Sequence, residues 1–89
     1  MALPEATIFE AFGLRFIRYR FLSEGDELPL HEHDFDHISV VDGGRVEVFG
    51  PDRRVEADLE AKPFMFRAGR PHGIRALSPG AIVLNVSLL

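Results

Sequence analysis

The sequence predicts an all-β fold, built as a small antiparallel barrel or sandwich. Short runs rich in β-branched and aromatic residues recur along the chain, and several of them alternate apolar with polar residues. Clusters of glycine, proline, serine and aspartate separate these runs at intervals typical of turns between strands. At 89 residues the chain is expected to form one domain over 1–89, with about eight or nine short strands.

The expected strands follow one another along nearly the whole chain. They cover residues 16–22, 36–42, 45–49, 53–59, 63–67, 73–77 and 81–88. Residues 4–12 are the one segment that could form a helical turn, although its β-branched and aromatic residues disfavour one. Gly43-Gly44 stands between two alternating runs and predicts a tight hairpin there, since such turns need positive φ.

The composition narrows the possible functions and location. A net charge of −4 argues against an electrostatic nucleic-acid binder, which needs a basic stripe. No apolar run is long enough for a membrane span, and the N-terminus lacks the pattern of a secretory signal. Cysteine is absent, so disulfides and thiolate ligands are not available. We therefore expect a cytoplasmic protein with neither a nucleic acid nor a membrane as partner.

The most specific feature of the chain is the spacing of its four histidines. His31, His33 and His37 lie within seven residues, and His72 follows a Gly-Arg-Pro turn. On a strand, residues of equal parity point to one face, so His31 and His33 emerge together. Histidine is the commonest metal ligand, because a neutral imidazole offers a nitrogen lone pair. The first hypothesis is therefore a metal site.

The spacing resembles the first sequence motif of the cupin family. That motif reads Gly, five residues, His-x-His, three or four residues, Glu, six residues, Gly. Here Gly25, His31, His33 and Gly44 match it, and His37 stands where the family usually has glutamate. Histidine at this position is a known variation in the family and retains a metal ligand there.

The second cupin motif is matched in part. It reads Gly, five residues, Pro-x-Gly, two residues, His, three residues, Asn, and Gly69 and His72 fit it. Ala61, Arg67 and Ala76 stand in place of its first glycine, its proline and its asparagine. The match rests on Gly69 and His72 in a turn before a strand.

The resemblance implies an antiparallel double-stranded β-helix, or jelly-roll barrel, that binds a metal ion inside through His31, His33, His37 and His72. Such an imidazole set suits one divalent transition metal ion, which the ligands alone do not identify among zinc, copper, iron, nickel and manganese. Four neutral imidazoles leave the charge of the ion uncompensated, so the site should favour an anionic ligand. Two alternatives remain: histidines on a polar loop without a metal, and a structural metal that stabilises a small barrel.

Three residues of one predicted strand are further candidates for the site. Arg18 and Arg20 share a face, and if that face points inward they could clamp a carboxylate or phosphate near the metal. If it points outward, the arginines are solvated and Tyr19, with its apolar neighbours, faces the core. Tyr19 could be a proton donor or a core aromatic residue.

Parity also predicts the faces of other strands. Because His37, Ser39 and Val41 share parity, a strand that turns His37 inward turns Ser39 and Val41 inward with it. Phe64 and Phe66 are expected to form one apolar wall. A second apolar wall is expected from alternate residues of the last strand, namely Leu84, Val86 and Leu88. Asn85 and Ser87 are then expected to face outward.

These observations favour a metal-dependent enzyme that acts on a small, anionic organic molecule, as an oxygenase or as an isomerase or lyase. The alternatives are a ligand-binding module without catalysis and a barrel with a structural metal. The pocket of so small a barrel must be shallow or completed by a second subunit. Cupins of this size are commonly homodimers, so the resemblance implies a homodimer, with residues 8–16 as a candidate contact.

Overall fold

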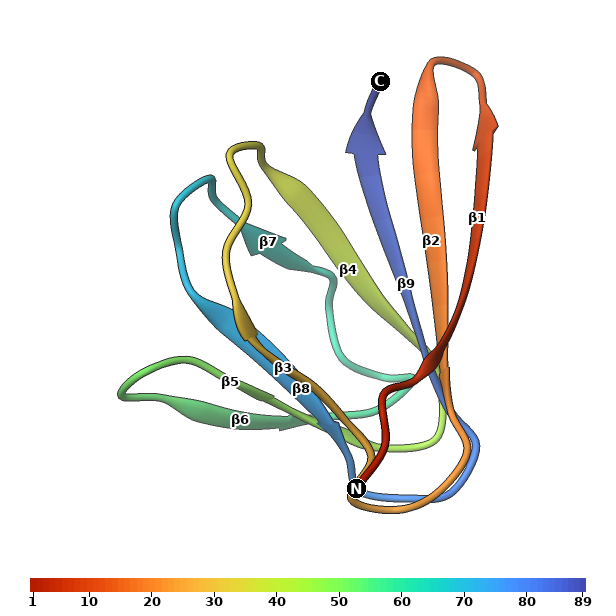
Figure 1. Ribbon diagram of the computed structural model, residues 1–89, viewed down its shortest axis with the longest axis vertical. Helices are drawn as coiled ribbons and strands as arrows, with labels where there is room; N and C mark the ends of the chain where they lie inside the picture. The colour runs from red at the N-terminus through yellow and green to blue at the C-terminus, as the bar shows by residue number, and fades with distance from the viewer.

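The computed structural model describes residues 1–89. The chain forms nine strands joined by turns and loops, which confirms the all-β prediction (Figure 1). The chain forms no helix that is long and apolar enough to cross a membrane. In chain order the strands are β1 (Glu5–Ala11), β2 (Leu14–Phe21), β3 (Glu27–His31), β4 (His37–Gly43), β5 (Val46–Phe49), β6 (Arg54–Ala57), β7 (Phe64–Phe66), β8 (His72–Ala76) and β9 (Ala81–Leu88).

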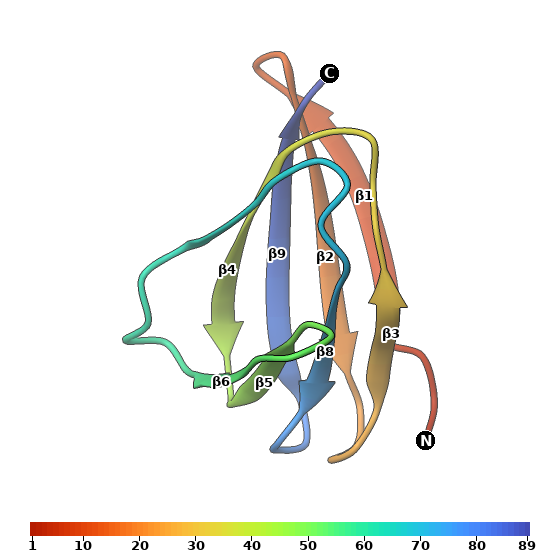
Figure 2. The ribbon, with the colours of Figure 1, turned by 90° about the vertical axis from the view of Figure 1, so that its left-hand side faces the viewer.

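The strands form two antiparallel sheets that enclose the core. One sheet has the order β1-β2-β9-β4-β7 and the other has the order β3-β8-β5-β6. Figure 2 shows β4, β9, β2 and β1 side by side, with β3 and β8 in front of them. Apolar side chains from both sheets fill the space between them, and the largest fully buried ones are Phe21, Ile74, Val46 and Val83. This arrangement is that of a jelly roll.

Strand register determines which side chains of the five-stranded sheet face the core. Residues directly opposite each other on antiparallel strands point to the same face. Ser39 lies opposite both Asn85 and Phe64, and Val41 lies opposite Val83. All of these except the half-buried Phe64 are buried, so the inward orientation predicted for Ser39 and Val41 is confirmed.

The predicted orientation of the last strand was wrong. Asn85 is only 6 % exposed, and it lies on the inner face together with the half-buried Ser87. The expected apolar wall of Leu84, Val86 and Leu88 therefore lies on the outer face. A buried amide needs a hydrogen-bond partner, and the Ser39 hydroxyl provides one by donating to Asn85 Oδ1 at 2.6 Å.

The N-terminal segment is a strand and not a helical turn. β1 pairs with β2 along its whole length, so that β2 provides partners for its backbone groups. Phe12 and Gly13 form the two-residue turn between the strands, with φ of 55° and 75°. A two-residue hairpin requires such values, because they match the twist of the flanking strands.

The hairpin predicted at Gly43-Gly44 was also wrong, because β4 and β5 belong to different sheets. Gly44 has a φ of 64°, yet the turn carries the chain from one sheet to the other. A Cβ atom on Gly44 would lie 2.6 Å from Ser78 Oγ and 3.0 Å from the Cα atom of Ala81. Glycine is therefore required by close packing against the turn before β9.

Candidate metal centre

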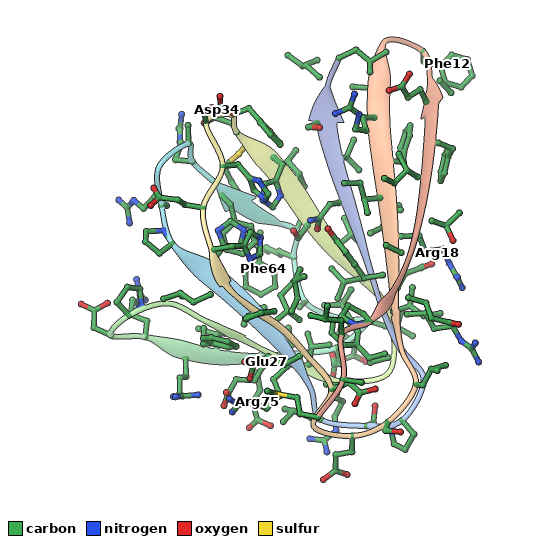
Figure 3. The ribbon with its side chains drawn as sticks, in the orientation of Figure 1. Phe12, Arg18, Glu27, Asp34, Phe64 and Arg75 are labelled. Carbon is green, nitrogen blue, oxygen red and sulfur yellow. The ribbon has the colours of Figure 1, made fainter.

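Two histidines face each other across the pair of strands β3 and β8. His31 ends β3, His72 begins β8, and the two are register partners. His33 follows in the loop after β3. One ligand atom from each of His31, His33 and His72 lies within 4.8 Å of the others, so these three residues could hold a metal ion. Asp34, in the loop that follows His33, lies at the upper end of the barrel in Figure 3.

The fourth histidine reaches the same place from the other sheet. His37 is the first residue of β4, and its Nε2 atom lies 3.1 Å from Nε2 of His72. Its ring centroid is 5.1 Å from that of His33. His37 and His72 are each 4 % exposed, whereas His31 and His33 are partly exposed. The structure thus places His37 beside His72, whereas the group whose ligand atoms all lie within 4.8 Å of one another consists of His31, His33 and His72.

Hydrogen bonds at Nδ1 determine which nitrogen of each ring can serve as a ligand. His31 Nδ1 lies 2.7 Å from the carbonyl oxygen of Pro29, and His72 Nδ1 lies 2.9 Å from that of Arg70. A carbonyl oxygen can only accept a hydrogen bond, so both Nδ1 atoms carry the proton in the neutral ring. The Nε2 atoms of His31 and His72 are therefore left with a free lone pair.

A hydroxyl group lies beside Nδ1 of His37. Ser39 Oγ lies 3.4 Å from His37 Nδ1, and it donates its own proton to Asn85 Oδ1. Its oxygen can accept a hydrogen bond from Nδ1 of His37, and in that tautomer Nε2 is free to bind a metal ion. Four of the five buried polar or charged side chains form one continuous line from β8 to β9: His72, His37, Ser39 and Asn85.

The electrostatic environment keeps these rings neutral. Burial, with His72, His33 and His31 nearby, lowers the pKa of His37 to about 4. Burial also lowers the pKa of His72, and burial with His31 nearby lowers the pKa of His33. The Nε2 atoms of the neutral His37 and His72 rings face each other at 3.1 Å. A proton on His37 Nε2 can join them in a hydrogen bond, and a metal ion between them can bind both nitrogens.

The distance between His37 and His72 suits a shared transition metal ion. Metal–nitrogen bonds of ~2.0–2.1 Å place neighbouring ligand atoms roughly 2.9–3.4 Å apart in octahedral or tetrahedral geometry. The Nε2 atoms of His37 and His72 fall within this range at 3.1 Å. The donor set therefore fits a divalent transition metal ion and offers it no carboxylate.

Two phenylalanines hold the imidazole rings in place. Phe66 stacks on His72 with ring centroids 4.1 Å apart, and Phe35 stacks on His33 at 4.8 Å. Phe64 lies beside Phe66 in a second stacked pair, and Figure 3 shows it pointing into the space between the sheets. The wall predicted from Phe64 and Phe66 thus borders the histidines directly.

A cleft of about 690 Å³ reaches the site at His72. The cleft lies between the β5–β6 hairpin and β7, and the loop between β7 and β8 closes one end. His72 lines it together with Phe64 and Phe66. β6 and β7 are edge strands of their sheets, so no strand pairing seals this side of the barrel. The volume is that of a site for a small molecule.

Comparison with known proteins supports the fold. No family model matches the chain, and no curated protein matches it. Among solved structures, an RmlC-like cupin protein from Desulfovibrio desulfuricans has a TM-score of 0.79 at 22 % identity, over 96 % of this chain and 82 % of that one. A cupin-2 domain protein from Shewanella frigidimarina has a TM-score of 0.77 at 18 % identity, over 100 % and 84 %. This chain has the cupin fold.

A third similar structure with a different name has the same architecture. KdgF from Halomonas sp. has a TM-score of 0.79 at 23 % identity, over 91 % of this chain and 75 % of that one. All three structures match nearly the whole of this chain. The predicted jelly-roll cupin fold is therefore confirmed at the level of the backbone.

Arg18 and Arg20 lie away from the histidines of this cupin barrel. They lie on the outer face of β2, opposite Leu84 and Ile82, and Figure 3 shows Arg18 pointing away from the site. Arg20 pairs with Glu5 at 3.3 Å on the surface. The register thus agrees with the alternative of solvated arginines and not with an inward clamp.

Tyr19 faces inward, but at a different level of the barrel. It lies opposite Val83, which in turn lies opposite Val41, four residues along β4 from His37. At about 3.3 Å per residue this is a separation of roughly 13 Å along the strand. Tyr19 packs against the core, and burial raises its pKa. Its surroundings are those of a core aromatic residue.

Several residues around the site were not predicted from the sequence. The line from Ser39 to Asn85 was missed because Asn85 was assigned to the wrong face. Arg53, Arg67 and Arg70 line the cleft, and two of them flank Gly69 in the second motif. The position of Arg67 and Arg70 near Gly69 was the sequence feature that could have identified these two residues. Gly73 was also missed: a Cβ atom there would overlap the ring of Phe49.

Proposed function

We propose that this chain binds one divalent transition metal ion through His31, His33, His37 and His72 and is a metal-dependent enzyme. Its substrate is a small organic anion, and its reaction is that of an oxygenase or of an isomerase or lyase. The observation that carries the proposal is the convergence of the imidazoles on His72, which lines an open cleft. Their Nε2 atoms include a pair only 3.1 Å apart.

The assignment of His37 as a ligand rests on its position. Its Nδ1 atom lies beside the Ser39 hydroxyl, and its Nε2 atom faces Nε2 of His72. A buried lone pair without a donor or a cation is costly. A shared metal ion satisfies both nitrogens at once, which supports the four-histidine site over a site of three.

The open cleft favours a functional site over a structural one. Structural zinc sites are closed by four protein ligands, whereas catalytic sites keep positions for water or substrate. His72 lines the cleft, and His31 and His33 are partly exposed. An ion held here would remain reachable by a small molecule.

The residues of the chain have distinct tasks in this proposal. A bound divalent ion would polarise a substrate oxygen atom and, if redox-active, would also permit oxidative chemistry. The carbonyl groups of Pro29 and Arg70 and the hydroxyl of Ser39 orient the rings, as outer partners of metal ligands commonly do. Phe64 and Phe66 exclude water from one side of the site and provide apolar contact for a substrate.

Elemental analysis and cobalt substitution test the proposal. Untagged protein should contain about one transition metal ion per chain, or take up one on reconstitution, and His72→Ala should abolish binding. All four histidines lie in the cluster, so no remote histidine can bind the ion instead. In the cobalt form, azide should change the visible spectrum, because an open position accepts it. A spectrum that azide leaves unchanged would indicate a closed, structural site, and absence of metal after reconstitution would overturn the proposal.

We also propose that the chain forms a homodimer through the β1–β2 hairpin. β1 is an edge strand whose outer backbone groups have no partner strand, and the hairpin carries exposed apolar residues: Ile8, Phe9 and Phe12. In Figure 1 this hairpin extends beyond the four-stranded sheet. A second copy related by a two-fold axis can pair antiparallel with β1 and cover these side chains. This interface includes most of the segment predicted from the sequence.

A further inference from the structure

We infer that Arg67 and Arg70, with Arg53 across the cleft, select a substrate that carries a carboxylate on an apolar body. The inference rests on the proposed function and assigns the substrate class of the same site. Arg67 and Arg70 belong to the segment that enters β8 and its metal ligand His72. Arg53 belongs to the turn between β5 and β6, and all three line the cleft.

These arginines differ from most others in the chain because their charges are not compensated. Arg53 and Arg70 form no side-chain hydrogen bond or ion pair, and Arg67 has only a distant one, 3.9 Å from Asp36. In contrast, five arginines form ion pairs of 3.5 Å or less with glutamates: Arg15, Arg20, Arg45, Arg54 and Arg75. Of the cations without a close ion pair, Arg53, Arg67 and Arg70 line the cleft, whereas Arg18 and Lys62 do not.

The charge of the cleft is opposite to that of the molecule. The chain as a whole carries a net charge of −4. The cleft is lined by three arginines and a single acidic residue, Asp52. A negatively charged chain that gathers free arginines around one opening attracts anions to that opening, and guanidinium groups bind carboxylates through paired hydrogen bonds.

The loop that carries Arg67 and Arg70 is held against the metal ligands. The amide of Gly69 donates to the carbonyl of His33 at 2.7 Å, and the amide of Arg70 donates to the carbonyl of Arg67 at 3.1 Å. The carbonyl of Arg70 accepts the hydrogen bond from His72 Nδ1. The backbone of Arg70 therefore orients a metal ligand while its side chain lines the cleft.

The rest of the lining defines the other part of the ligand. Phe49, Phe64, Phe66, Pro51 and Pro71 provide apolar surface between the arginines and His72. A fully polar anion would leave this surface without a contact. An aromatic or branched aliphatic carboxylate would place its body on the phenylalanines and its charge at the arginines.

Binding of benzoate and of its neutral analogue benzamide tests the inference. Both compounds are titrated into metal-free and zinc-loaded protein, and the amide signals of Gly50 and Gly69 are followed by NMR. We expect benzoate to bind at least about fivefold more tightly than benzamide. Arg67→Gln and Arg70→Gln should each weaken benzoate binding by about three- to tenfold and leave benzamide unchanged. Arg18→Gln is the matched control, since Arg18 forms no ion pair but lies on the outer face of β2.

The two metal states separate this inference from the proposed function. If the arginine dependence appears in metal-free protein and the protein takes up no zinc, the inference holds and the proposed function fails. If zinc binds but Arg67→Gln and Arg70→Gln bind benzoate as the wild type does, the inference is overturned and the metal site stands. Equal affinity for benzoate and benzamide, or no binding of benzoate in either form, also overturns it.

Discussion

The Nε2 atoms of His37 and His72 lie 3.1 Å apart although the two residues belong to different sheets. β4 and β8 do not pair with each other, so this contact joins the two layers of the barrel through side chains alone. An ion shared by these rings would therefore connect the sheets directly.

Metal removal should destabilise the protein. Because the ion would bind the folded chain and not the dispersed histidines of the unfolded chain, its binding free energy adds to folding stability. At a metal concentration a thousandfold above Kd the gain is about 4 kcal/mol. Thermal unfolding with and without a chelator measures it. His37→Asn should show almost no response to the chelator, and a response equal to that of the wild type would exclude His37 as a ligand.

Ser39→Ala should weaken metal binding without altering a ligand. The variant removes the hydroxyl beside His37 Nδ1 and leaves Asn85 Oδ1 without its donor. Loss of such outer partners costs ~10- to 100-fold in metal affinity, and the unpaired amide lowers stability by roughly 1–3 kcal/mol. Competition titration with a chromophoric chelator measures the affinity. Ser87→Ala is the control, because Ser87 forms no side-chain hydrogen bond, and equal effects of the two variants would contradict the prediction.

The metal-free protein should lose stability as the pH falls from 7 toward 4. The pKa of His37 is about 4 in the folded chain, against an ordinary value of 6.5. Between these values the unfolded chain binds a proton that the folded chain excludes, so acid favours unfolding. The contribution of His37 amounts to at most roughly 3 kcal/mol. Urea denaturation at several pH values should give a flatter profile for His37→Asn, and identical slopes would show that His37 is not the source.

Gly73→Ala should disturb one wall of the cleft. A Cβ atom at this position would overlap the ring of Phe49 and lie 3.0 Å from the carbonyl oxygen of Leu28. Overpacking of this kind typically costs ~1–3 kcal/mol. Chemical denaturation and the Kd for benzoate report on stability and on the cleft. Gly50→Ala is the control, because its Cβ atom would meet only the Pro71 carbonyl at 3.5 Å, and similar losses in both variants would argue against a specific clash.

Phe12→Ser should weaken self-association. Phe12 is 98 % exposed at the tip of the β1–β2 hairpin, and it carries a positive φ. Sedimentation velocity over a range of concentrations should show a dimer for the wild type and a shift toward monomer for the variant. Leu59→Ser provides the comparison, since Leu59 is 65 % exposed but lies outside the hairpin. A monomeric wild type would refute the dimer.

The sequence predicted the local pattern of the fold more reliably than its long-range pairing. Alternation and turn residues identified most of the strands, and the parity of His37 and Ser39 correctly predicted their orientation. β1 was missed because its sequence contains no core residue: all but the last of its side chains are exposed. Its strand conformation comes from pairing with β2, which a local pattern does not reveal.

The errors at Gly43-Gly44 and Asn85 have a common cause. A glycine turn has the same sequence pattern whether it joins neighbouring strands or carries the chain to the other sheet. In the same way, alternation in β9 defines two faces but not which one is buried. Hydrophobicity favoured Leu84 and Val86 for the core, whereas the hydrogen bond between Ser39 and Asn85 accounts for the opposite arrangement. Only a partner far away in the sequence resolves such cases.

The candidate site was predictable because it rests on four residues of one type. Histidine spacing identified the four rings but gave no information on Arg53, Arg67 and Arg70, which resemble other surface arginines in the sequence. Arg18 and Arg20 were selected instead because they share parity on one strand. In the structure Arg18 and Arg20 lie on the outer face of β2. The other three arginines line the cleft between β6 and β7.

The register pair His31 and His72 has a consequence for the order of folding. These partners are separated by 41 positions in the chain, and His37 approaches them from the opposite layer. Contacts between such distant segments form slowly, because long loops must close first. A partly folded chain with only its local hairpins would hold at most the neighbouring histidines. Tight binding of the ion would therefore require both sheets to be assembled. The rate at which tight metal binding appears during refolding would measure the rate of that final step.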